Sequence, residues 1–374
     1  MNNLHGILFA YSATRRLKEL SEHRTASSVP FGGRYRVIDF MLSSMVNAGV
    51  RDIGVIMREN YQSLLDHLGS GRDWDLSRKR GGLRLLPPFC YTGTQRGENY
   101  FRGRMEALGG VSSYISRIRQ GYVVLADGDI VVNLPFDHVF SEHLRSGADI
   151  TCLCTKNFLE SDYTEAFYTL NSKNRITDIV SGKAGDNSDA YESMNAYIMS
   201  KQMLENLVSH CAARNLHHFN QDVLQAMKDE LLLYAYPFDG YCARLTSVGA
   251  YYKHSLDLLD PDIRAQLFPR GRPILTKVRD DASTYCGQDS VVRNSFVADG
   301  CFIEGHVENS VIFRGVKVHA GAVVQNSILM QDTVVRKGGK LSYSVADKNV
   351  TVSENHMLMG HSTYPIAISK GAVV

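Results

Sequence analysis

The stretch SVIFRGVKVHAGAVVQNSILMQDTVV, residues 310–335, carries a small or β-branched residue at every sixth position. Three earlier positions continue the series after a one-residue slip in phase, and the full set is Val291, Val297, Ile303, Val316, Ala322, Ile328 and Val334. Gly300, Gly315 and Gly321 stand where the chain would turn. This period is typical of a parallel β-helix, whose stacked coils bury a continuous apolar axis. We predict a β-helix over residues 285–374, with an irregular β-sandwich as the alternative.

The region before this repeat has a different pattern. Over residues 1–255, apolar β-rich runs alternate with helical stretches, which indicates a mostly parallel sheet covered by helices. The predicted strands are Gly6–Ala10, Asp52–Met57, Tyr122–Leu125 and Ile150–Cys154, and Ile38–Asn47 is a predicted helix. The working loops of such a sheet follow the carboxyl ends of its strands, here Tyr11–Arg16, Asp127–Asp129 and the loops beyond residue 155. Residues 256–284, with Pro261, Pro269 and Pro273, are a predicted linker.

Composition excludes several classes of protein. The 374 residues carry 41 Lys and Arg against 39 Asp and Glu, a balance that argues against nucleic-acid or membrane-surface binding by bulk charge. A hydrophobic content of 44% excludes a disordered chain, and no apolar run approaches the ~20 residues of a membrane span. Met1–Ala10 is a predicted strand and not a signal peptide, so we expect a cytoplasmic protein. The seven cysteines form no CxxC pair and are expected to be reduced core thiols.

A family resemblance rests on VPFGGRYRVIDF, residues 29–40, which follows Arg16, Leu17, His23 and Arg24 at a specific spacing. Together with residues 310–335 and Lys277–Asp281, this segment resembles the bacterial ADP-glucose pyrophosphorylases, or glucose-1-phosphate adenylyltransferases. The resemblance implies a nucleotide-diphospho-sugar transferase domain, Rossmann-like with a mostly parallel sheet, followed by a left-handed β-helix. It also implies assembly as a tetramer.

The chain departs from the family pattern at the nucleotide loop. Family enzymes read G-G-x-G-x-R-L after the first strand, and bare glycine backbone can approach phosphate oxygens closely. The three glycine positions are here Tyr11, Ser12 and Thr14, so we predict a filled cradle. Arg16 matches the family arginine that contacts pyrophosphate, and a purely structural role is equally open. The family lysine of the R-A-K-P segment is Ala26.

The metal site is also altered. The resemblance assigns two carboxylates to Mg²⁺, which needs hard oxygen ligands. Asp129 matches the first, but Arg244 stands at the second position. A guanidinium ~4 Å from a divalent ion costs about 8 kcal/mol at an effective dielectric of ~20, so we expect no metal here. Two arrangements remain open: Arg244 pairs with Asp129 in place of the metal, or the two residues are not neighbours.

The sugar-phosphate pocket departs from the family in the same way. Ser181 and Gly182 stand at the Glu and Lys places of an E-K-P segment, and Lys183 lies one residue further on, where a slip would be needed to use it. The S-M-G segment reads Ser193, Met194 and Asn195. The stretch Gly103–Ala107 replaces G-T-A-D-A.

A chain with these losses resembles the regulatory-type subunits of the family, and the resemblance implies a catalytically impaired subunit that modulates a GlgC-type catalytic partner in a hetero-tetramer and binds no cofactor itself, with Mg²⁺ only in the partner. Two alternatives stay open: a low-activity glucose-1-phosphate adenylyltransferase, and a homo-oligomeric sugar-phosphate sensor. The resemblance places phosphorylated sugar effectors in a basic cleft between the domains, where clustered guanidinium groups suit phosphate. The candidate effector residues are His23, Arg24, Arg34, Arg36, Arg314 and Lys317; a solvated charged face is the alternative.

Overall fold

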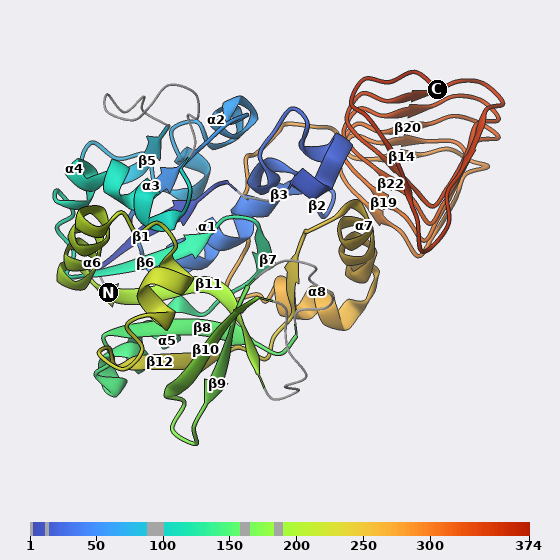
Figure 1. The fold of residues 1–374 in the computed structure, drawn as a ribbon. Coiled ribbons are helices and arrows are strands. Elements are labelled where there is room, and N and C mark those ends of the chain that lie inside the picture. Colours follow the sequence, from blue (N-terminus) through green and yellow to red (C-terminus); the bar gives the residue numbers. More distant parts are fainter. Residues whose placement is uncertain (1–2, 12–14, 88–100, 158–164, 183–189) are drawn as a thin grey trace.

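A computed structural model describes residues 3–11, 15–87, 101–157, 165–182 and 190–374. It has two parts, a sheet with helices on its faces and a prism of short stacked strands beside it (Figure 1). In the first part the elements are β1 (Leu4–Phe9), η1 (Arg15–Ser21), η2 (Ala26–Ser28), β2 (Pro30–Phe31), β3 (Tyr35–Arg36), α1 (Val37–Asn47), β4 (Asp52–Ile56), α2 (Gln62–Leu68), η3 (Arg72–Trp74), β5 (Gly82–Leu86), α3 (Arg104–Gly110), α4 (Ser112–Ile115), β6 (Tyr122–Asp127), β7 (Ile130–Val132), α5 (Phe136–Ser146), β8 (Ile150–Thr155), β9 (Glu165–Leu170), β10 (Ile176–Gly182), β11 (Tyr191–Ser200), α6 (Lys201–Arg214), η4 (Phe219–Gln225), β12 (Leu233–Pro237), β13 (Cys242–Arg244), α7 (Val248–Leu256), η5 (Asp257–Leu259) and α8 (Pro261–Leu267).

The large sheet confirms the predicted strands and the helix at α1. Its strand order is β10-β9-β11-β6-β1-β4-β5, and β8 joins β11 to β12. The segment β5-β4-β1-β6 is parallel, whereas β11 runs antiparallel to β6 and β8. Ile7 and Phe9 pack on one face with α3, α4 and α6, and Leu8 packs on the other with α1 and α5. Because β1 is buried on both faces, it reads as a continuous apolar run.

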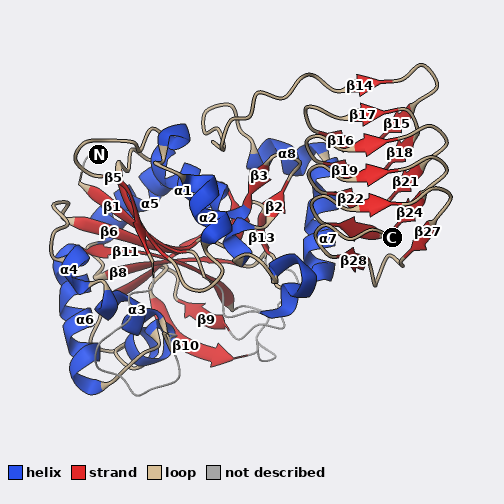
Figure 2. Ribbon diagram, turned by 90° about the horizontal axis from the view of Figure 1, so that it is seen from above, coloured by secondary structure: helices blue, strands red, loops and turns tan. Residues whose placement is uncertain are grey.

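The second part is the predicted β-helix. Its strands are β14 (Tyr285–Cys286), β15 (Val291–Arg293), β16 (Phe296–Val297), β17 (Phe302–Ile303), β18 (His306–Glu308), β19 (Val311–Ile312), β20 (Lys317–Val318), β21 (Val323–Gln325), β22 (Ile328–Leu329), β23 (Val334–Val335), β24 (Lys340–Ser342), β25 (Ser344–Ala346), β26 (Thr351–Val352), β27 (Met357–Met359) and β28 (Ile366–Ile368). They form three parallel sheets of five strands each, the sides of the prism in Figure 2.

Two positions of the predicted six-residue series are wrong. Val291 pairs with His306 in β18, where Val307 is the fully buried residue. In β23, Val335, and not Val334, is fully buried. The cause is the coil length: Val335 pairs with Val318 and with Val352, each 17 positions away, so the pattern slips by one residue against an 18-residue coil. Gly300, Gly315 and Gly321 all have positive φ, as expected for corners.

The predicted linker over 256–284 is not a free connection. It contains η5 and α8, and the chain after α8 is bonded to the first domain by side chains of α1. Ser43 Oγ accepts from Leu275 N at 2.8 Å, and Asn47 Nδ2 donates to Pro273 O at 3.0 Å. The prolines of this segment predicted a linker but gave no indication of these hydrogen bonds.

Asp39 is the hub of this attachment. Its carboxylate is fully buried and accepts from Thr276 Oγ1 at 2.6 Å and from Arg36 N at 2.9 Å. His67 Nε2, from α2, lies 2.6 Å from the other carboxylate oxygen. One buried side chain therefore joins α1, α2 and the segment that leads into the β-helix.

Two further expectations concern cysteines and membranes. Six cysteines are described, all are free thiols, and only Cys286 among them is exposed; Cys90 lies outside the described residues. Among the helices that the structure describes, none is both long and apolar enough to cross a bilayer.

The Asp39 hub makes a prediction for stability. Asp39→Ala leaves three buried donors without their acceptor, which we expect to cost about 3 kcal/mol of unfolding free energy. Urea unfolding followed by the fluorescence of Trp74, whose ring lies 5.5 Å from that of His67, measures the loss locally. Asp73→Ala is the control, because Asp73 accepts one bond of 3.3 Å from the same segment, at Val278 N. Equal losses in the two variants would contradict the hub.

Candidate functional site

The residues predicted for the nucleotide loop follow β1 at the carboxyl edge of the sheet. Tyr11 packs its ring against Phe9 and Phe101, with centroids 6.0 and 6.4 Å away, and the Arg58 guanidinium lies 6.0 Å from it. Burial raises the pKa of the Tyr11 hydroxyl above its ordinary value. An aromatic side chain thus packs where the family has bare backbone. Ser12 and Thr14 lie outside the described residues, and only the backbone of Arg16 is described, in η1.

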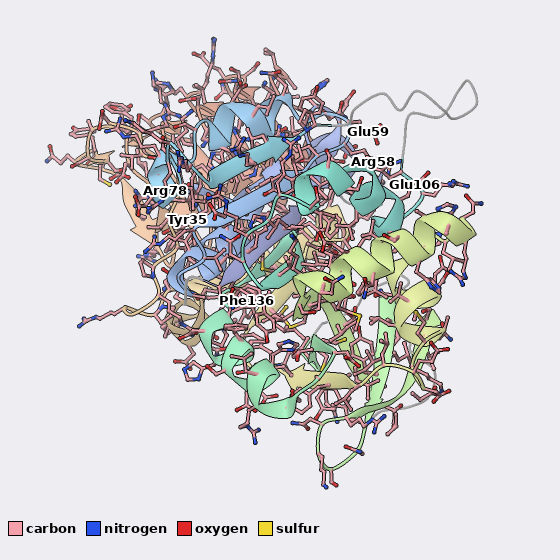
Figure 3. All side chains as sticks on the ribbon, turned by 90° about the vertical axis from the view of Figure 1, so that its left-hand side faces the viewer. Tyr35, Arg58, Glu59, Arg78, Glu106 and Phe136 are labelled. Atoms are coloured by element: carbon pink, nitrogen blue, oxygen red, sulfur yellow. The ribbon has the colours of Figure 1, made fainter. Side chains whose placement is uncertain are left out.

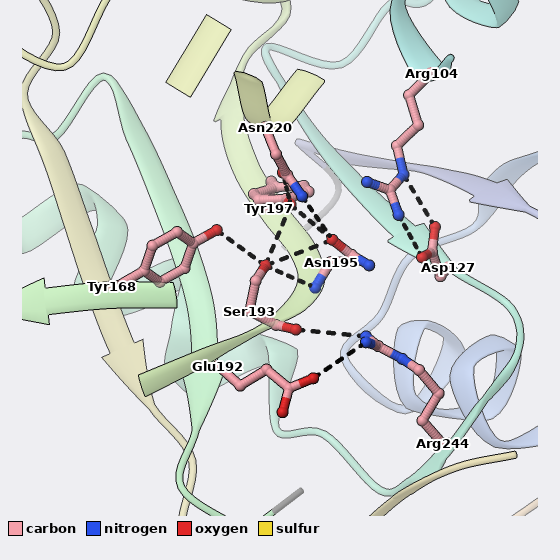
Figure 4. A network of polar contacts seen from close by, with 9 residues as sticks. All are labelled: Arg104, Asp127, Tyr168, Glu192, Ser193, Asn195, Tyr197, Asn220 and Arg244. Atoms are coloured by element: carbon pink, nitrogen blue, oxygen red, sulfur yellow. Dashed lines mark hydrogen bonds and ion pairs between the residues drawn. The ribbon is translucent and has the colours of Figure 1, made fainter. Parts of the chain in front are cut away.

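Asp127 ends β6 at the same edge and is held by an arginine that the sequence did not single out. Arg104, the first residue of α3, places Nη2 at 2.5 Å and Nε at 3.2 Å from the two carboxylate oxygens (Figure 4). The side chains are 20% and 10% exposed, so water screens this pair little. A bidentate pair of this kind satisfies both oxygens and neutralises the charge.

Arg244 forms a second, longer ion pair with a carboxylate. Its Nη1 lies 3.5 Å from Glu192 Oε1, and its Nη2 donates to Ser193 O at 3.4 Å (Figure 4). The β7–β13 register sets Arg244 opposite Ile130, the residue after Asp129, so the backbone positions are neighbours as one of the two open arrangements requires. Sequence reasoning missed Glu192 as a partner. A bond from Arg244 to Asp129 stays a prediction.

The pocket predicted for the sugar phosphate is filled by a polar network. Asn195 has φ +51°, a conformation that glycine adopts freely and asparagine tolerates, so the backbone of the S-M-G segment persists with a side chain added. Asn195 Oδ1 accepts from the Tyr197 hydroxyl at 3.0 Å and from Asn220 Nδ2 at 3.3 Å. Ser193 Oγ accepts from the Tyr168 hydroxyl at 2.9 Å (Figure 4). The polar side chains of this pocket therefore form hydrogen bonds with one another.

The lysine position of the E-K-P segment is unsuited to a side chain. Gly182 ends β10 with φ +145°, a conformation that strains any residue with a Cβ. Lys183, the residue that a slip would bring into use, lies outside the described residues.

This arrangement does not fit the two-carboxylate magnesium site of the family. Asp127 and Glu192 are each paired with an arginine, and Arg244 occupies the second ligand position. Across the ranges that the structure describes, no group of three or more His, Cys, Asp or Glu is placed to hold a metal ion. The second carboxylate ligand beside Asp129 is therefore missing, and the guanidinium of Arg244 stands in its place.

The six candidate effector residues do not form one cluster. Arg24 and Arg36 lie together, facing Lys348 and Lys370 of the β-helix domain. Arg34 and Arg314 form a second group with Arg279, in which Arg314 Nε lies 4.0 Å from Asp281. His23 and Lys317 are exposed, with His23 4.0 Å from Glu22. The structure thus gives the candidates two sets of neighbours, and the effector cleft itself stays a prediction.

The Arg24 group spans the two domains. Arg24 Nη2 lies 2.5 Å from Asp347 Oδ2, and both side chains are almost fully buried. Arg36 donates to Ser63 O at 2.5 Å, and burial lowers the pKa of its guanidinium to about 10. Burial, with Arg36 and Arg24 beside it, lowers the pKa of Lys348 to about 7. We call Arg24, Arg36, Lys348 and Lys370 the interdomain cation cluster.

A pocket of about 520 Å³ adjoins this cluster at Arg24. It is bounded by the segment 18–26 and by Tyr11, Arg58, Glu59 and Asn60, and Figure 3 labels Arg58 and Glu59. Within the described residues, Arg24 Nη1 and Thr25 Oγ1 are buried and have no hydrogen-bond partner. Buried donors without a partner are costly, and both atoms belong to residues that line this pocket.

Comparisons with known proteins agree on the family. The nucleotidyl transferase family matches residues 6–260, and the GlmU-like C-terminal hexapeptide matches residues 278–363. The chain is 32% identical over 372 residues to glycogen biosynthesis protein GlgD of Bacillus subtilis (strain 168), covering 100% of this chain and 97% of the relative. It is 34% identical to GlgD of Geobacillus stearothermophilus, covering 86% and 83%. It is 31% identical to glucose-1-phosphate adenylyltransferase of Geobacillus stearothermophilus, covering 85% and 82%.

The Arg104–Asp127 pair makes a second prediction for stability. Arg104→Met leaves a mostly buried carboxylate without its partner, and we expect a loss of about 2–3 kcal/mol in urea unfolding. Arg102→Met is the matched control, because Arg102 is 51% exposed and its ion pair with Glu106 is worth less than about 1 kcal/mol. In the double variant Arg104→Met/Asp127→Asn we expect much of the lost unfolding free energy to be regained. A loss in Arg104→Met no larger than in Arg102→Met would contradict the assignment.

Proposed function

Because the chain belongs to the nucleotidyl transferase family, and over its whole length to the GlgD group within it, we propose that it is a catalytically impaired regulatory subunit of a glucose-1-phosphate adenylyltransferase. In this role it modulates a GlgC-type catalytic partner that makes ADP-glucose for glycogen biosynthesis. The observation that carries the proposal is the internal neutralisation of the vestigial site, where Arg104 and Arg244 hold Asp127 and Glu192.

Each step of adenylyl transfer needs a group that this site has lost. Nucleotide phosphates require donors and a metal to offset their charge, and the metal is itself held by free carboxylates. Here Arg244 stands at the second ligand position, and the Asn195 network occupies the sugar side. The neighbouring carboxylates of Asp127 and Glu192 have cationic partners and would have to break low-exposure ion pairs before they could serve as ligands instead.

The effector part of the proposal rests on the interdomain cation cluster. Arg24, Arg36 and Lys370 all act on Lys348, and Asp347, which holds Arg24, is the one carboxylate that acts on it. An excess of positive charge that is partly withdrawn from water is stabilised by a bound anion, and guanidinium groups favour phosphate. A phosphorylated sugar metabolite is therefore the effector class. Bound between the domains, it contacts both and can bias their arrangement.

The partner is proposed to dock at the last coil of the β-helix. Met357 and Met359 project from β27, which ends its sheet, and they are 56% and 63% exposed. Tyr364, in the following turn, is 73% exposed. Apolar side chains beside an unpaired strand edge support an assembly surface, since such edges otherwise invite aggregation.

The isolated chain, assayed with Mg²⁺, ATP and glucose 1-phosphate, should turn over at least a thousandfold below the typical enzyme value of about 10 s⁻¹. The reason is the absence of an available carboxylate pair for the metal. Turnover within tenfold of that value would establish the alternative, an adenylyltransferase in its own right.

Co-expression with a GlgC-type catalytic subunit should give a mixed oligomer by light scattering, with altered turnover or effector response of the partner. Met359→Lys should weaken the mixed oligomer at least tenfold, because the interface would bury an unpaired charge. Tyr285→Lys, at the opposite end of the prism and 54% exposed in this chain, is the matched control. If only self-association occurs, the sensor alternative replaces the partner proposal.

A further inference from the structure

The pocket beside Arg24 lies where sheets of this kind bind small molecules. Tyr11, which follows β1, and Arg58, which follows β4, both line it, and these two strands are parallel neighbours. Ligands of such sheets bind outside the carboxyl ends of the strands. The pocket volume of about 520 Å³ falls within the range of small-molecule sites, roughly 300–1,000 Å³. Position and size together favour a ligand site.

The buried wall of this pocket carries polar groups that the protein itself does not use. Arg24 and Thr25 line the pocket and are 5% and 8% exposed. Within the described residues, Arg24 Nη1 and Thr25 Oγ1 have no hydrogen-bond partner. Arg24 Nη2 lies 2.5 Å from Asp347 Oδ2, so the β-helix domain holds the guanidinium in place. Oxygen atoms of a ligand would supply the acceptors that Nη1 and Oγ1 lack.

The outer part of the pocket has the opposite character. Glu22 and Glu59 line it and are exposed, and Glu19 is half-buried. Asn60 Nδ2 donates to the backbone oxygen of Glu22 at 3.3 Å, which connects the loop after β4 to the segment that carries Glu19 and Glu22. Carboxylates accept hydrogen bonds from hydroxyl groups and repel a second anionic group. The outer part therefore suits the hydroxyl groups of a ligand.

Ala26 makes the pocket particular to this chain. The family pattern has a lysine at this position, whereas Ala26 is buried and lines the pocket. A lysine side chain would take up part of the space that the alanine leaves open. The loss of a family side chain thus contributes room for a different ligand.

We propose that this pocket binds a sugar monophosphate, with the phosphate group at Arg24 and Thr25 and the sugar hydroxyl groups at Glu22 and Glu59. Guanidinium groups bind phosphate oxygens well, and the threonine hydroxyl adds a donor. The inference rests on the effector part of the proposed function. It assigns the effector a site on the Nη1 side of Arg24, in the first domain.

Arg24 connects such a ligand to the β-helix domain. Its Nη1 would contact the phosphate group while its Nη2 contacts Asp347. A bound phosphate therefore stabilises the guanidinium in the orientation that pairs with Asp347. Ligand binding and the attachment of the two domains then favour each other by the same factor.

Titration calorimetry on the full chain tests the ligand class. Glucose 6-phosphate and fructose 6-phosphate are the probes, and inorganic phosphate is the comparison. We expect at least one of the two hexose phosphates to bind about tenfold more tightly than inorganic phosphate, because the carboxylates add hydrogen bonds to the sugar. Equal affinities for all three compounds would overturn the assignment of a sugar monophosphate.

Thr25→Val tests the site, because it removes the hydroxyl and nearly keeps the shape of the side chain. Since Thr25 Oγ1 has no partner in the described chain, we expect the variant to fold normally and to bind the hexose phosphate about tenfold more weakly. Thr177→Val is the matched control, because Thr177 is exposed on β10 and does not line the pocket.

Lys370→Met separates this site from the interdomain cation cluster, and we expect it to leave hexose phosphate binding unchanged. Binding that is lost in Lys370→Met and unchanged in Thr25→Val overturns the pocket assignment and leaves the effector part of the proposed function intact. Absence of binding by both hexose phosphates overturns the pocket and the effector part together. The turnover of the isolated chain and the mixed oligomer test the rest of the proposed function independently.

Discussion

A buried charge in a protein is stabilised by an oppositely charged or hydrogen-bonding partner, is neutralised by a change of protonation, or is offset by a bound ligand. This constraint applies at each of the buried charged sites of the molecule. Asp39 meets it with three donors and so attaches the connecting segment to α1 and α2. Asp127 and Glu192 meet it with arginines. At the interdomain cluster Asp347 meets it for Arg24, and burial lowers the pKa of Lys348 to about 7. A site whose charges are paired within the protein offers little to a charged ligand, whereas a site with excess positive charge favours an anion.

Much of the fold could be predicted, because it depends on local periodicity. The apolar run of β1 and the six-residue repeat each report burial along a single strand or coil, which sequence spacing encodes directly. The prediction of Val334 instead of Val335 as the buried residue shows the limit of this approach. A coil of 17 residues shifts the six-residue pattern by one position, and only the pairing between stacked coils reveals that shift. The attachment of the predicted linker to α1 was missed for a related reason. Its bonds to Ser43 and Asn47 join residues more than 200 positions apart.

The candidate site was predictable in what it lacks and not in what replaces it. Tyr11, Gly182 and Asn195 stand at positions where the family pattern requires other residues, and such substitutions can be read directly from the sequence. The side chains that these residues and their neighbours contact in the folded protein cannot. Arg104 reaches Asp127 from the start of α3, and Glu192 reaches Arg244 across the bulge of β11, where the register with β8 shifts. Lys348 carried no sequence signal, since a lysine beside an aspartate usually reads as a local pair.

The retained backbone explains how the family's site could close without loss of the fold. Asn195 keeps the positive φ of a glycine position and then bonds to Tyr197 and Asn220, so the strand needs no rearrangement to accept it. Arg244 likewise sits at its register position on β13 and gains a carboxylate neighbour on β11. Side chains can therefore fill a ligand site while the sheet that supported it stays intact. Because that sheet also positions η2 and β3, closing the vestigial site leaves Arg24 and Arg36 free to face the β-helix.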